Sequence, residues 1–250
     1  MSRQQHGWDC GYANTLALLQ TLARRGHGSA AEAVAARVAP RGDLPTTIHA
    51  IQRTVEMAWG AGFDQRSARQ YRWRLVGREG KAGWIGAAEC FTLLSYLRVD
   101  AFVVEVVDRS GAGHAVYEAA AAWFAQEDAD ASPDGAPATS PSATSGRPLA
   151  RSPRLPLYLQ GQGHSTTLVG VLRSPPRLLI RDPKDAPLER LRCFPPANLD
   201  GRQWQIVGVS SDGALREEQV LARCGDDLQT AARWEHGRWK YEEWFGLRFR

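Results

Sequence analysis

Cys10 is the residue whose type and setting best suit covalent chemistry. It lies within residues 7–14 (Gly-Trp-Asp-Cys-Gly-Tyr-Ala-Asn), directly before an apolar run over 15–22 whose leucines have the spacing of a helix. A cysteine at a helix N-terminus gains thiolate character from the unpaired N–H groups and the helix dipole, as in enzymes with a sulfur nucleophile. The alternative is a structural cysteine, since free cysteines are often buried.

A histidine and an aspartate farther along the chain could complete a catalytic set. His164 follows an apolar strand at about 156–160 and a Gly-Gln-Gly turn, and it opens a second strand at about 165–172. Asp182 closes the next strand, at about 177–182. In a hairpin these ends lie side by side, so the carboxylate can orient the imidazole while the other ring nitrogen faces a thiol. The alternative is a histidine in a turn and an aspartate that ends a strand before proline.

Three segments, in this order, carry a resemblance to a known family. They are 7–14, Trp-Ile-Gly-Ala-Ala-Glu at 84–89, and Leu-Tyr-Leu-Gln-Gly-Gln-Gly-His-Ser at 157–165. They resemble the papain-like cysteine peptidases of the ubiquitin-fold-modifier protease family (peptidase family C78). The similarity is closest to its deubiquitinase branch, which contains zinc-finger-containing and short fungal forms. It extends from Gly7 to about Arg223 and is interrupted by one polar insert.

The resemblance implies Cys10 as nucleophile, His164 as general base and Asp182 as the residue that orients the base. The chain departs from the family pattern at Asp9, where the family usually has glycine, and at Ala13, where it usually has arginine. An acidic neighbour disfavours a thiolate. A weakly active or non-catalytic ubiquitin binder is therefore one alternative to an active peptidase.

The segment around Asp182 distinguishes the branches of the family. Proteases for the ubiquitin-fold modifier carry Asp-Pro-His, whereas this chain has Asp182-Pro183-Lys184 and its histidine lies upstream. We therefore expect a deubiquitinase, a cysteine-type ubiquitinyl hydrolase that cuts after the C-terminal glycine of ubiquitin. A protease for another ubiquitin-like modifier is the second alternative.

Acyl transfer also needs donors for the oxyanion that forms on the attacked carbonyl. The backbone N–H of Cys10 suits this role at a helix start. Gln4 lies six residues earlier, the spacing at which papain-like enzymes place an oxyanion glutamine, and Gln5 and Gln162 are alternatives.

Ubiquitin ends in Arg-Leu-Arg-Gly-Gly, so its tail requires acidic partners and a narrow passage. The resemblance implies that Asp64 and Glu89 bind the two arginines. The alternatives are a helix cap for Asp64 and a solvated helix residue for Glu89. Trp8 and Trp84 could form the walls of a glycine tunnel, although core packing is the commoner use of a tryptophan.

The composition is that of an ordinary globular enzyme. The chain has 250 residues, 43% hydrophobic and 23% charged, with a net charge of +4. The basic residues are scattered, so we expect no nucleic-acid partner. The four cysteines are far apart and none has zinc-ligand spacing, so we expect no metal, no cofactor and a reducing compartment, cytoplasmic or nuclear. We find no signal peptide or membrane-spanning run, and we expect a monomer that binds ubiquitin or polyubiquitin chains.

The predicted fold is a single α+β papain-like domain over 1–250, in which a helical N-terminal half carries the nucleophile and packs on a mostly antiparallel sheet. A polar segment, 126–154, is expected to be a disordered insert. Predicted helices lie at about 11–25, 29–38, 46–60, 65–76, 86–97, 115–125 and 214–222, and further strands at about 100–107 and 203–210. The aromatic-rich segment 226–250 is predicted to be a helix packed on the domain or, alternatively, a partner-binding element.

Overall fold

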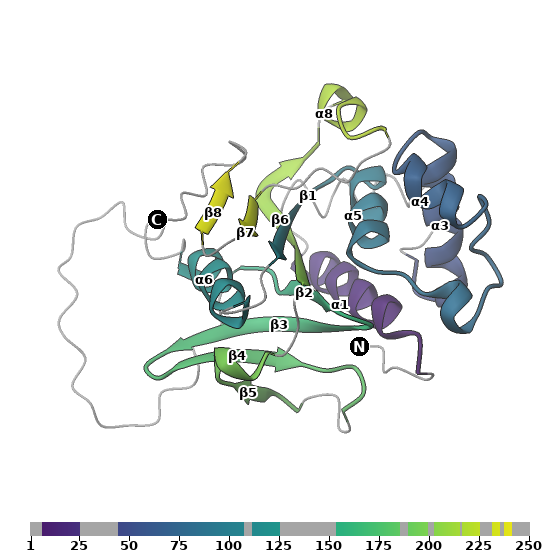
Figure 1. Ribbon diagram of the computed structural model, residues 1–250. Helices are drawn as coiled ribbons and strands as arrows, with labels where there is room; N and C mark the ends of the chain where they lie inside the picture. Colours follow the sequence, from purple (N-terminus) through teal and green to yellow (C-terminus); the bar gives the residue numbers. More distant parts are fainter. Residues whose placement is uncertain are drawn as a thin grey trace.

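The computed structural model describes residues 7–25, 45–107, 112–125, 154–185, 190–199, 203–215, 217–225, 232–235 and 238–241. Most helices come from the first half of the chain and most strands from the second (Figure 1). The helices are α1 (Cys10–Arg25), α3 (Ile48–Gly60), α4 (Gln65–Gln70), α5 (Ala87–Tyr96), α6 (Ala112–Ala125) and α8 (Glu217–Leu221), with 3-10 turns η2 (Gly80–Gly83) and η3 (Pro196–Asn198). The strands are β1 (Val99–Val107), β2 (Leu157–Gly161), β3 (His164–Arg173), β4 (Pro176–Arg181), β5 (Arg192–Phe194), β6 (Gln203–Ala214), β7 (Ala232–Glu235) and β8 (Arg238–Tyr241).

The strands form one sheet in the order β5-β4-β3-β2-β6-β1-β7-β8. Among these described strands, every neighbouring pair is antiparallel except β1 and β7. Side chains alternate along β1: Val103 joins a core with α1 and α5, whereas Val104 joins a core with α6. The helices therefore cover both faces of the sheet, and the predicted α+β papain-like fold, with the nucleophile helix packed on a mostly antiparallel sheet, is confirmed.

The first turn of α1 lies directly against the segment that precedes α5. A Cβ on Gly11 would overlap the Ile85 carbonyl oxygen and lie 2.8 Å from Cγ1 of the same residue, so only glycine allows this approach. The neighbouring Tyr12 donates a hydrogen bond of 2.6 Å through its hydroxyl to the Gly83 carbonyl. These contacts hold residues 83–85 against the first turn of α1.

Two predicted helices are shorter than expected. The helix predicted over 65–76 ends at Gln70, because Arg72 and Trp73 adopt φ values of 53° and 57° and this left-handed backbone cannot continue a right-handed helix. The helix predicted over 214–222 is also wrong at its start. The β6 ladder continues to Ala214, where it pairs with Val99 of β1.

The predicted helix in the aromatic tail is wrong where the structure describes it. Residues 232–235 and 238–241 form β7 and β8, and β7 extends the sheet beside β1. Apolar or aromatic residues alternate with charged residues in both segments, which is the period of a strand. The strand β5, three residues long at the sheet edge, was not predicted either, because so short a segment carries no periodic pattern.

Some predictions fall outside the described residues: the helix at 29–38, Gln4, Gln5, and the insert 126–154 apart from Arg154. Within the described ranges, the structure contains no helix with the length and apolar character that a membrane crossing requires.

Gly11→Ala should lower both stability and activity, since the new methyl group would meet backbone rather than a side chain that can move aside. Overpacking of this kind costs about 1–3 kcal/mol. The measurement is the midpoint of thermal unfolding together with the reactivity of Cys10. Gly60→Ala is the matched control, because nothing lies within 4 Å of its Cβ position. Equal midpoints for the two variants would contradict the close contact.

Candidate active site

Cys10 is the first residue of α1 and is only 8% exposed. Burial alone would raise the pKa of its thiol, but interactions with His164 and Ser165 outweigh burial and hold the pKa below its ordinary value. The free N–H groups and the dipole at the helix start favour a thiolate further. Cys10 therefore has the setting of a nucleophile, in contrast to Cys90, whose pKa burial raises to about 12.

His164 is the first residue of β3, and Asp182 follows the last residue of β4. The ring Nε2 lies 3.0 Å from Oδ1 and 3.1 Å from Oδ2 of the carboxylate, so the hairpin ends meet as the sequence predicted. The interaction with the Asp182 carboxylate, followed by that with Cys10, raises the pKa of His164 to about 9. Nδ1 is buried and lacks a hydrogen-bond partner in the described part of the chain, so it is the nitrogen left to face the thiol.

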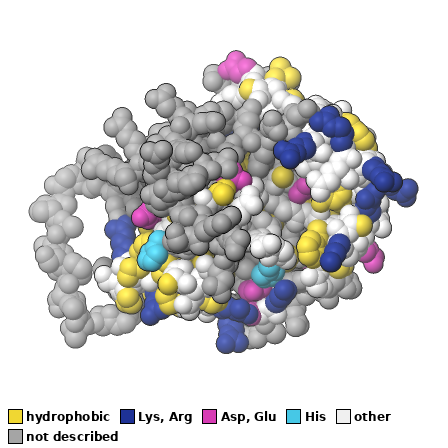
Figure 2. Space-filling view, in the orientation of Figure 1, with side chains coloured by type: hydrophobic (Ala, Val, Ile, Leu, Met, Phe, Trp, Pro, Cys, Tyr) yellow, Lys and Arg dark blue, Asp and Glu magenta, His cyan; other side chains and the backbone are white. Residues whose placement is uncertain are grey.

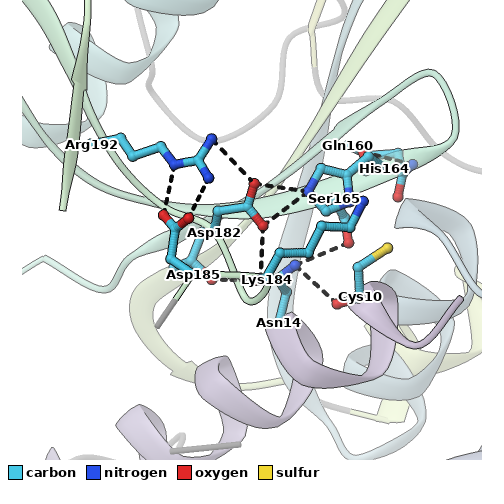
Figure 3. Close-up of polar contacts among 10 residues, drawn as sticks. Cys10, Asn14, Gln160, His164, Ser165, Asp182, Lys184, Asp185 and Arg192 are labelled. Carbon is cyan, nitrogen blue, oxygen red and sulfur yellow. Dashed lines mark hydrogen bonds and ion pairs between the residues drawn. The ribbon is translucent and has the colours of Figure 1, made fainter. Parts of the chain in front are cut away.

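Asp182 is held in place by more than the imidazole (Figure 3). Its Oδ1 accepts a hydrogen bond of 2.9 Å from the Lys184 backbone N–H, and Arg192 lies 3.8 Å from Oδ2. Arg192 is itself held by Asp185, whose Oδ2 accepts from Nε at 2.6 Å. Burial would raise the pKa of Asp182, but these partners, His164 first, keep it below its ordinary value, so the carboxylate stays charged.

A buried polar contact joins the nucleophile helix to the histidine strand. Asn14, one turn after Cys10, donates through Nδ2 to the Ser165 hydroxyl at 3.0 Å and to the Cys10 carbonyl at 2.9 Å. Its Oδ1 accepts from the Thr167 hydroxyl at 2.7 Å. We call Asn14, Ser165 and Thr167 the α1–β3 clamp. The clamp was not predicted from the sequence, although an asparagine four residues after Cys10 on the buried face of an apolar helix is a usable signal.

Gln160 is a further residue that the sequence analysis missed. Its side-chain amide donates to the carbonyls of Gly161 and His164 at 2.7 Å and 3.1 Å, and its Oε1 accepts from Tyr158 at 2.9 Å. It thereby holds the turn that presents His164. Among the predicted oxyanion glutamines, Gln162 lies exposed in that turn. Gln4 remains a prediction, because it lies outside the described residues.

Asp64 and Glu89 lie close together in the helical layer. Asp64 caps α4 by accepting from the Ser67 backbone N–H at 3.2 Å, as its alternative reading predicted, and also accepts from Thr92. Glu89 accepts from the Gly86 N–H at 2.8 Å and is only 6% exposed, so the solvated-helix alternative is wrong. Burial, together with the nearby charge of Asp64, raises the pKa of Glu89. Neither carboxylate is paired with a lysine or arginine in the described residues.

Trp8 and Trp84 both lie close to residues at the start of α1. The Trp8 ring packs edge-to-face on Tyr12, with centroids 5.7 Å apart. The Trp84 carbonyl accepts a hydrogen bond from Tyr71, and the residue precedes Ile85, which contacts Gly11. Both tryptophans are therefore near the start of α1, and their role as tunnel walls remains a prediction.

On the described part of the face in Figure 2, histidine, acidic and basic side chains adjoin one another near the lower edge, close to the start of α1 and of β3 in Figure 1. No group of three His, Cys, Asp or Glu side chains in the described ranges could hold a metal ion. What the arrangement offers is a thiol with a lowered pKa, an imidazole with a raised pKa and a fixed carboxylate, which suit acyl transfer.

Comparison with known proteins gives a consistent result. The model of peptidase family C78 matches residues 1–191. Proteins named zinc finger-containing ubiquitin peptidase 1 are similar to this chain: the human protein is 32% identical over 238 residues and the Bos taurus protein 30% identical over 239 residues. In both cases the match covers 87% of this chain but only 36% of the relative. A crystal structure of UfSP from C. elegans is 14% identical, with a TM-score of 0.47, over 83% of this chain and 31% of that one.

The pH dependence of Cys10 alkylation should reveal the thiolate–imidazolium pair. Because the thiol pKa is lowered, the rate with iodoacetamide should reach half its plateau below the pH typical of a free cysteine. Asp182→Asn removes the largest cause of the raised His164 pKa, so the imidazolium is lost at lower pH and the inflection of Cys10 should move upward.

The measurement uses a Cys193→Ser, Cys224→Ser background, which leaves Cys10 and the fully buried Cys90. Lys184→Gln is the control, because only its backbone contacts Asp182. An inflection near that of free cysteine in the parent would contradict the ion pair.

Proposed function

This chain belongs to peptidase family C78, and we propose that it is a deubiquitinase, a thiol isopeptidase that cleaves the bond after the C-terminal glycine of ubiquitin. The observation that carries this proposal is the arrangement of Cys10 at a helix start, His164 at a strand start and the hydrogen bond of His164 with Asp182. The names of the similar proteins support ubiquitin as the modifier. We further propose that the protein acts as a monomer in the cytoplasm or nucleus.

The proposed reaction is a two-step acyl transfer. The Cys10 thiolate attacks the carbonyl carbon of the terminal glycine, and the N–H groups at the start of α1 can stabilise the oxyanion. The C–N bond then breaks as the His164 imidazolium gives its proton to the leaving lysine amine. Water, deprotonated by the now neutral His164, hydrolyses the thioester and releases the glycine carboxylate, which restores the thiolate–imidazolium pair.

The acidic pair Asp64 and Glu89 supports ubiquitin as substrate. Two like charges in a buried setting repel each other, which is part of the reason why the pKa of Glu89 is raised. Arginine side chains from a bound ubiquitin tail would relieve that repulsion through charge-assisted hydrogen bonds. We propose that both residues bind these arginines, in addition to capping their helices.

Activity-based probes test the proposed function directly. Ubiquitin with a C-terminal propargyl group should label the parent protein on Cys10, as seen by an intact-mass increase and loss of the free thiol. Cys10→Ala should not be labelled, and Asp182→Asn should be labelled more slowly. Labelling by a probe built on another ubiquitin-like modifier, with none by ubiquitin, would favour the alternative substrate and overturn the proposal.

Replacing Asp64 or Glu89 should weaken cleavage of ubiquitin substrates. Removing either carboxylate deprives one ubiquitin arginine of its charge-assisted hydrogen bond, which should lower kcat/KM about ten- to a hundredfold. Against ubiquitin with its last arginine changed to alanine, the variant that removes the matching carboxylate should show little further loss of activity, which is the signature of direct coupling. The measurement is kcat/KM for two variants, Asp64→Asn and Glu89→Gln, on both substrates.

Glu56→Gln is the matched control, because its carboxylate also caps backbone N–H groups, at 2.5 Å for Leu75 and 2.6 Å for Val76. Its effect should add fully to that of the ubiquitin change. If Asp64→Asn and Glu89→Gln are additive as well, the two carboxylates are structural only.

A further inference from the structure

A pocket of about 500 Å³ borders His164 and Asp182, and Cys10 is not among its lining residues. Both residues form part of its wall. The rest is largely apolar, with Ile180 of β4, Phe194 of β5 and Trp204 of β6 among the lining side chains. The pocket is thus built from the sheet edge and not from the nucleophile helix.

The alternation along β3 places the pocket on the opposite face of the sheet from Cys10. Ser165 and Thr167 point toward α1, where they contact Asn14. Thr166 lies between them in sequence, so its side chain points to the other face, and it lines the pocket. His164 stands at the strand start between the two faces, with Nδ1 left for the thiol and Nε2 on Asp182.

The position of the pocket beside His164 indicates which half of the substrate it would contact. The acyl half, the ubiquitin tail, becomes bonded to Cys10, whereas the leaving amine must contact the imidazole that protonates it. The amine meets Nδ1 on the Cys10 side of the ring, and the polypeptide that carries the lysine continues past His164 toward the pocket that His164 lines.

The lining favours an uncharged, apolar occupant. Ile180 and Phe194 present hydrocarbon, and the Arg192 guanidinium is already bound by Asp185 and Asp182. The Trp204 ring packs directly on Gly161, because a Cβ added to that glycine would lie 2.6 Å from the ring. The volume exceeds what a lysine stem alone can fill.

We infer that this pocket is a leaving-side subsite that binds an aliphatic or aromatic side chain next to the modified lysine of the substrate protein. The inference rests on the proposed deubiquitinase activity and adds to it a preference on the leaving side of the bond. Apolar burial in the subsite raises kcat/KM because the same contact positions the amine against His164.

Matched isopeptide substrates test the subsite. Ubiquitin is linked to the lysine of two short peptides that differ only in having leucine or glycine on both sides of that lysine. The parent should cleave the leucine substrate roughly tenfold faster in kcat/KM, the discrimination typical of a small apolar group in a pocket. Phe194→Ala, at the edge strand, and Asn198→Trp, which fills the mouth, should each reduce this preference to about twofold or less.

Ubiquitin-propargyl labelling is the reference, because that probe has almost nothing on the leaving side, and its rate should stay unchanged in both variants. Met57→Ala, an exposed apolar truncation on α3, should keep the preference. Equal cleavage of the two peptides by a parent that labels normally would overturn the subsite while the proposed function stands. A parent that neither labels nor cleaves would overturn the proposed function and, with it, the assignment of this ligand.

Discussion

The hydrogen bonds of Asn14 with Ser165 and Thr167 determine how the two halves of the chain meet at the site. The nucleophile and the base lie far apart in sequence and belong to different elements, a helix start and a strand start. All three members of the α1–β3 clamp are buried, so an unpaired group would cost about 1–3 kcal/mol. This cost fixes the register of α1 on β3, and the register in turn fixes the position of Cys10 relative to His164.

The cost of burying a polar group also determines the contacts on the other side of the imidazole. Asp182 would be costly to bury as a lone charge, and His164, the Lys184 backbone N–H and Arg192 together offset that cost. Asp185 holds the guanidinium in turn. The imidazole is therefore enclosed between a fixed anion on Nε2 and the thiol side on Nδ1, which is why its pKa is raised even though burial acts in the opposite direction.

The sequence predicted the local elements with strong periodic patterns and the pairing of the two hairpin ends. Glycine or proline stands next to each of three boundaries and sets it locally: the helix start at Cys10, the strand start at His164 and the end of β4 before Asp182. The structural features that the sequence did not predict depend on tertiary contacts. Arg192 reaches Asp182 because the three-residue edge strand β5 pairs with β4. The helix α4 ends early because two residues after it, neither of them glycine, adopt a left-handed backbone that the sequence does not indicate.

The central claim is that the α1–β3 clamp brings the thiol against His164 and so forms the ion pair. It is tested by following the ring protons of His164 by NMR as a function of pH in the parent, Cys10→Ala and Asn14→Ala, with His164→Gln to assign the signal among the six histidines. The account predicts titration near pH 9 in the parent, where Asp182 and Cys10 both favour the imidazolium, and a lower pKa in Cys10→Ala that Asn14→Ala reproduces. A parent His164 that titrates near its ordinary pKa, or an Asn14→Ala variant that titrates like the parent, would contradict the account.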